Sequence, residues 1–144
     1  MHRVEQLMVN GHEMPMLVFE PRASGLHAGV IVAQHLLVAH AGLELDPFQI
    51  EVGERYAQAG YKVAMPFLFH WWPTAADISV KREKFRDDWT VTNLRVTLSR
   101  LSGQPDVHED AIGLLGHCWV DASHGLVPAL YQNSLPPRCF MEGE

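Results

Sequence analysis

The chain has 144 residues, of which 47% are hydrophobic and 19% are charged, and its formal net charge is −6. This length and composition predict one globular domain with its own core and exclude a disordered chain. The negative charge argues against nucleic acid or an anionic membrane as the main partner. No stretch approaches the roughly 18 uncharged apolar residues of a membrane helix.

The first predicted elements form an antiparallel hairpin. Two segments, Val4–Val9 and Met14–Phe19, flank Asn10-Gly11, a dipeptide that favours tight hairpin turns. We expect this pair at one edge of a sheet. Gly29–Gln34 follows as a continuous apolar run, which is typical of a central strand buried on both faces.

A helix is predicted over Asp46–Ala59. Its first residue serves as N-cap, Pro47 occupies the first helical position, and Gln49 reaches back in a capping-box arrangement. Gly60 ends the helix. Tyr61–Met65 is the next expected strand.

The second half of the sheet follows the same alternation. Thr74–Asp77 offers a helix start, and apolar periodicity predicts a helix over Lys81–Leu101 that Gly103 ends. Ala111–Leu115 is a third buried strand. Buried strands that alternate with helices predict an α/β fold with these three strands adjacent and parallel. The full expectation is a mostly parallel sheet with an N-terminal antiparallel hairpin and helices on both faces.

Gly116-His117-Cys118-Trp119 directly follows the third buried strand. A strand that ends in Gly-x-Cys-x is typical of a nucleophile elbow, where a sharp strand-to-helix turn exposes the nucleophile. We therefore predict Cys118 as a catalytic thiol, with the backbone N–H groups of Trp119 and Leu36 in the oxyanion hole. The alternative interpretation is a buried structural thiol at a strand end.

Two tryptophans, Trp71 and Trp72, precede Pro73 in an aromatic loop after the second buried strand. Loops at the carboxyl ends of parallel strands form the site in open α/β sheets, so these rings are candidates for a substrate-facing wall. They serve equally well as a cover for the sheet edge. The nine histidines lack metal-ligand spacing, and neither a metal nor a cofactor is expected.

The cellular setting is inferred from the cysteines and the N-terminus. Cys118 and Cys139 are too few for a disulfide framework, and Met1–Gln6 leads into no signal-peptide core. We expect a reducing, cytoplasmic setting. The oligomeric state is left open.

From Gly29 to Trp119 the chain resembles the dienelactone hydrolase family of α/β-hydrolases. The resemblance rests on the first buried strand and on Gly42-Leu43, Arg55–Tyr61, Met65–Phe69 and Ile112–Trp119. It implies a Cys-His-Asp triad that opens lactones, with Cys118 as nucleophile and a small-molecule ester or lactone as partner. Gln34-His35 stands where the family has His-Glu, and no position matches the family's Asp and His.

The segment after Trp119 departs from the family, which continues with Gly-Gly and a small apolar helix. A one-base shift of a permitted coding sequence for Val120–Leu126 reads Gly-Gly-Arg-Val-Ala-Trp-Leu, as such a helix should. We therefore expect residues 1–119 to be the N-terminal portion of a hydrolase domain and residues 120–144 to be an out-of-frame tail. The alternative is a genuinely shortened protein with its own C-terminus.

Two functions follow. The first is a cysteine hydrolase of an ester or lactone, impaired in this chain because the triad's acid and histidine find no match. The second is a non-catalytic α/β binding or interaction module that retains the elbow.

Overall fold

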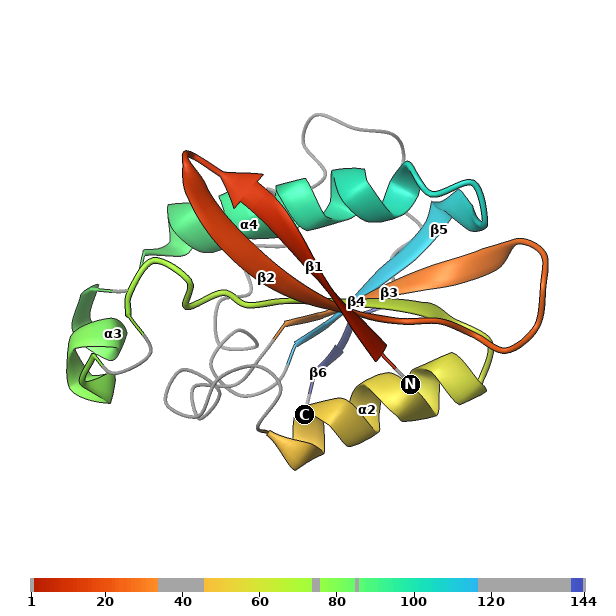
Figure 1. The fold of residues 1–144 in the computed structure, drawn as a ribbon, viewed down its shortest axis with the longest axis horizontal. Coiled ribbons are helices and arrows are strands. Elements are labelled where there is room, and N and C mark those ends of the chain that lie inside the picture. The colour runs from red at the N-terminus through yellow and green to blue at the C-terminus, as the bar shows by residue number, and fades with distance from the viewer. Residues whose placement is uncertain (1, 34–45, 74–75, 85, 117–140, 144) are drawn as a thin grey trace.

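The computed structural model describes residues 2–33, 46–73, 76–84, 86–116 and 141–143 (Figure 1). Their strands form one six-stranded sheet in the order β1-β2-β4-β3-β5-β6. The strands are β1 (His2–Val9), β2 (His12–Phe19), β3 (His27–Ala33), β4 (Lys62–Pro66), β5 (Val107–Gly116) and β6 (Met141–Gly143). The helices are α2 (Pro47–Gln58), α3 (Ile78–Lys84) and α4 (Asp87–Ser102). Figure 1 shows α2 and α4 on opposite faces of the sheet, which confirms the predicted α/β architecture.

The N-terminal hairpin forms as predicted. Asn10 and Gly11 have φ angles of 48° and 81°, and this left-handed pair makes the tight turn whose twist matches the strands. β1 pairs with β2 along its whole length, from His2 opposite Phe19 to Val9 opposite His12. β2 continues antiparallel onto β4, so β1 lies at the edge of the sheet.

The three apolar runs are adjacent parallel strands. Val30 of β3 lies opposite Val63 of β4 on one side and Gly113 of β5 on the other. Val32, Ala64 and Met65 are fully buried, as expected for strands covered by a helix on each face. The prediction of strand type and neighbourhood is confirmed, although β5 begins earlier than expected, at Val107.

Helix α2 has the predicted ends but not the predicted capping box. Asp46 Oδ1 accepts hydrogen bonds from the N–H groups of Phe48 and Gln49 at 3.0 and 3.4 Å, and Gly60 follows the helix with φ of 99°. The Gln49 side chain does not reach back. It is fully buried, and its amide atoms have no hydrogen-bond partner among the described residues.

The predicted helix over Lys81–Leu101 is wrong, because two helices occupy this stretch. α3 ends at Lys84, and Arg86 is extended, with φ of −124° and ψ of 131°, before α4 begins. Negative side chains favour helix starts, and Asp88 in the first turn of α4 receives two hydrogen bonds from Arg86. The predicted earlier start is confirmed, since Asp77 accepts a 2.8 Å bond from the Ser79 N–H at the beginning of α3.

The tail contributes one strand that the sequence did not predict. β6 pairs in parallel with the end of β5, with Met141 opposite Leu114 and Gly143 opposite Gly116. The carboxyl-terminal end of β5 is therefore paired on both of its edges, with β3 on one side and β6 on the other. A strand edge offers free N–H and C=O groups to any extended segment, whatever its side-chain pattern.

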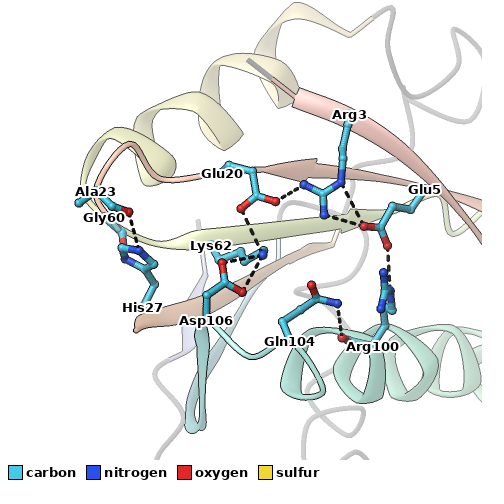
Figure 2. Close-up of polar contacts among 10 residues, drawn as sticks. All are labelled: Arg3, Glu5, Glu20, Ala23, His27, Gly60, Lys62, Arg100, Gln104 and Asp106. Carbon is cyan, nitrogen blue, oxygen red and sulfur yellow. Dashed lines mark hydrogen bonds and ion pairs between the residues drawn. The ribbon is translucent and has the colours of Figure 1, made fainter. Parts of the chain in front are cut away.

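An ionic network joins the hairpin to the amino-terminal ends of the parallel strands (Figure 2). Its members are Arg3, Glu5, Glu20, Lys62, Arg100 and Asp106. At its centre the Lys62 ammonium lies 2.9 Å from both Asp106 oxygens and 3.2 Å from Glu20 Oε2, and the Lys62 side chain is only 4% exposed. Arg100, in the last turn of α4, binds Glu5 of β1 at 2.9 Å. The network thus fixes the edge hairpin to α4, β4 and the start of β5.

Candidate active site

The carboxyl ends of β3, β4 and β5 meet at one edge of the sheet, because these strands are parallel. The register places Ala33, the last residue of β3, opposite Gly116, the last residue of β5. The two chain segments predicted to supply the oxyanion hole and the nucleophile therefore leave the sheet at the same level, side by side. Cys118, Trp119 and Leu36 themselves lie outside the described residues, so their roles stay predictions.

The predicted aromatic wall follows β4 at the same edge. Its backbone is held by hydrogen bonds, from Phe67 N to Pro15 O at 2.8 Å and from Trp72 N to Phe69 O at 3.3 Å. Five rings gather here, from the hairpin, the loop after β4 and the first turn of α4. We call them the Trp71 cluster: His12, His70, Trp71, Trp72 and Trp89.

Trp71 is the centre of this cluster. Its ring centroid lies 4.3 Å from that of His70, 5.0 Å from that of Trp89 and 5.0 Å from that of His12. Trp72 reaches Trp89 at 5.6 Å and packs against the core. The structure brings the two predicted tryptophans together on the start of α4. Both are partly buried, as either a wall or a cover requires.

Sequence reasoning missed the polar residues behind these rings. The fully buried Asn93 of α4 accepts a hydrogen bond at 2.9 Å from His70 Nε2 and donates one at 3.4 Å to the Leu68 carbonyl. The available signal was an asparagine on the inner face of a helix, since buried amides are almost always hydrogen-bonded.

The protonation of His70 follows from these contacts. Burial lowers the pKa of His70, and nearby His12 lowers it further, whereas the hydrogen bonds to Asn93 and to the Glu13 backbone partly oppose this. The neutral ring is therefore favoured. The Asn93 amide nitrogen is directed at the Leu68 carbonyl, so the Asn93 oxygen faces His70 Nε2 and is the acceptor in the tautomer that carries its proton on Nε2.

The described residues set limits on other chemistries. They contain no group of three His, Cys, Asp or Glu side chains placed to hold a metal ion. Among the helices that the structure describes, none is long and apolar enough to span a bilayer.

The strand order, the crossover helices and the N-terminal hairpin define the first half of an α/β-hydrolase fold. A dienelactone hydrolase-like promiscuous phosphotriesterase from metagenomic libraries matches with a TM-score of 0.75 at 17% identity, over 99% of this chain and 59% of that one. A dienelactone hydrolase from Anabaena variabilis matches with a TM-score of 0.58 at 17% identity, over 81% and 51% of the two chains.

A third solved structure, a candidate dienelactone hydrolase from Klebsiella pneumoniae, matches with a TM-score of 0.67 at 21% identity. The match extends over 83% of this chain and 50% of that one. The chain thus spans between half and three fifths of these structures. No protein-family profile matches the sequence, and no curated protein matches it.

Proposed function

We propose that this chain is the N-terminal portion of a dienelactone hydrolase-like enzyme that cleaves an ester or lactone with Cys118 as its nucleophile. The observation that carries the proposal is the register of Ala33 opposite Gly116. Because β3 and β5 end side by side, the chain segments that lead to Leu36 and to Cys118 begin at neighbouring points. These points lie at the edge where open α/β sheets bind ligands.

The chemistry begins with attack of the Cys118 thiolate on the carbonyl carbon. A carbon–sulfur bond forms, and the carbonyl electron pair moves to oxygen, where the N–H groups of Trp119 and Leu36 stabilise the negative charge. Collapse of this intermediate breaks the carbon–oxygen bond to the alcohol, which takes up a proton as it leaves. Water then hydrolyses the thioester and restores the thiol.

The second half-reaction needs a base to activate water, and no position of this chain matches the family's histidine or acid. We therefore propose that the 144 residues acylate faster than they deacylate. Exposure to p-nitrophenyl acetate should release about one equivalent of nitrophenol in a burst, followed by slow turnover. Mass spectrometry should locate the acetyl group on Cys118.

Matched variants separate this function from its alternative. Cys139→Ser should keep the burst, and Cys118→Ser should lose it. Iodoacetamide should also label Cys118 roughly tenfold faster than Cys139 at neutral pH, because a thiolate is the reactive form. A non-catalytic binding module predicts no burst and equal labelling, and that result would reject the hydrolase proposal.

We also propose a division of the chain into two parts. Residues 1–119 form the hydrolase portion, and residues 120–144 are translated out of frame, although β6 pairs with β5. The nucleotide sequence after the Trp119 codon tests this directly. A shifted frame that encodes Gly-Gly, a small apolar helix and a downstream Asp and His is expected, whereas stop codons in that frame would overturn the division.

A further inference from the structure

The outer side of β1 is a long strand edge without the usual obstacles to pairing. β1 runs for eight residues, His2–Val9, and pairs with β2 in one unbroken register. It stands first in the strand order, so no strand that the structure describes lies on its outer side. Natural edge strands are often blocked by proline, by lysine or by a bulge. β1 has none of these three, and its Val4 and Met8 are 43% and 61% exposed.

The hairpin turn decides which backbone groups of β1 face outward. A two-residue turn is flanked by a hydrogen-bonded pair, here Val9 and His12, and such pairs alternate along an antiparallel ladder. The odd-numbered residues of β1 therefore direct their N–H and C=O groups toward β2. The even-numbered residues Val4, Gln6 and Met8 direct theirs outward, where a further strand could pair with them.

The side chains around Val4 are complementary to a second copy of themselves. Val4 lies between Arg3 and Glu5. If two β1 strands pair antiparallel about a twofold axis at Val4, Arg3 of each copy lies opposite Glu5 of the other. Opposite charges at such cross-strand positions attract. Arg3 and Glu5 are already held in place by the ionic network (Figure 2), so pairing would cost them little freedom.

From this edge and its charges we propose that β1 is an interface with a second copy of this chain. The two β1 strands pair antiparallel about Val4 and join the two sheets into one. His2 of each copy then lies opposite Gln6 of the other, and the same patch serves both copies, as in other twofold dimers. Edge pairing buries little surface, so we expect a weak equilibrium between monomer and dimer. The inference is independent of the chemistry proposed for Cys118.

Two charge-reversed variants test the pairing. Arg3→Glu leaves two acidic residues around Val4, and Glu5→Arg leaves two basic ones. Sedimentation equilibrium of the parent protein, under reducing conditions and at up to roughly 1 mM, should detect the dimer. Each variant alone should dimerise about tenfold more weakly, because like charges then face each other. An equimolar mixture should regain the affinity of the parent, since an acidic strand faces a basic one.

Cross-linking tests the register without reversing a charge. Val4→Cys and Met8→Cys are made in a chain that carries Cys118→Ser and Cys139→Ser. Pairing about Val4 brings the two residues at position 4 together and leaves the two at position 8 about 26 Å apart, at roughly 3.3 Å per residue. A short bismaleimide should therefore link Val4→Cys into dimers and leave Met8→Cys monomeric. Met8 is the matched control because it shares the face of Val4 and is more exposed.

The opposite results overturn the inference. These are a parent protein that stays monomeric at the highest concentration, dimers that both charge reversals leave unchanged, and a mixture no more dimeric than the separate variants. Cross-linking at position 8 equal to that at position 4 would also reject the pairing, since random encounters or another register would then explain it. Circular dichroism checks that each variant keeps the fold.

Discussion

Replacing Gly53 by alanine tests how closely α2 packs on the hairpin. A Cβ at Gly53 would lie 2.4 Å from Phe19 Cε2 and 2.5 Å from Phe19 Cζ. Phe19 is fully buried at the end of β2, and because protein interiors are close-packed its ring cannot turn aside without moving its neighbours. The glycine is required here by close approach of a helix to a ring, and the substitution must displace one of them.

Two opposing effects set the size of the change. Alanine favours a helix over glycine by about 1 kcal/mol. Overpacking a core costs about 1–3 kcal/mol, and a 2.4 Å approach, well inside the 3.4 Å of ordinary contact, places this site at the upper end. The expected net loss in free energy of unfolding is about 2 kcal/mol. For a domain of this size it corresponds to a fall in Tm of roughly 4–8 °C.

Urea unfolding followed by circular dichroism measures this loss, and a double-mutant cycle with Phe19→Leu assigns it. Once the ring is gone, Gly53→Ala should cost about 1 kcal/mol less than it does in the parent protein. Gln58→Ala, at an exposed position of the same helix, should change stability by less than about 0.5 kcal/mol. A Gly53→Ala protein as stable as the parent, or no coupling to Phe19, would refute the packing argument.

The remaining predictions concern the charged and polar groups. Removing the counter-ion of the buried Lys62 should lower the free energy of unfolding more than removing an exposed partner does. In urea unfolding we therefore expect Asp106→Ala to lose about 1–3 kcal/mol and Arg100→Ala less than about 1 kcal/mol. Equal losses would contradict this role of the network. The Lys62 hydrogen bond lowers the pKa of Asp106 below its ordinary value of 3.8. The stability that the Asp106 carboxylate contributes is therefore present above pH 3.8 and is lost as the pH falls below that value. Burial lowers the pKa of His70, whose contribution is lost as pH falls below 6.5, and His70→Gln should abolish that upper step in unfolding free energy against pH.

Elements with local signals were predictable from the sequence. The hairpin turn at Asn10-Gly11 and the start and stop of α2 at Asp46 and Gly60 depend on conformations and hydrogen bonds within a few residues, so the residue types alone indicate them. The buried strands were equally predictable, because β3 and β4 are covered on both faces and their residues are apolar after the first position of each, His27 and Lys62.

Features that depend on distant partners were not predictable. The break at Arg86 lies in a stretch whose apolar period continues across it, so periodicity cannot distinguish one helix from two. β6 forms because β5 offers it a free edge, which no property of Met141–Gly143 indicates. The bond between Asn93 and His70 joins residues 23 positions apart. The predicted roles of Cys118 and Leu36 remain predictions.

Helix α4 connects the ionic network to the Trp71 cluster. Its 16 residues span about 24 Å, with Trp89 and Asn93 toward one end and Arg100 in its last turn at the other. The charged end clamps the hairpin, whereas the aromatic end faces the edge where chemistry is proposed. Stability and the proposed site can therefore be altered by substitutions in different parts of the same helix. Substitutions in its last two turns are expected to change how well the chain folds, and substitutions in its first two turns are expected to change what the proposed site recognises.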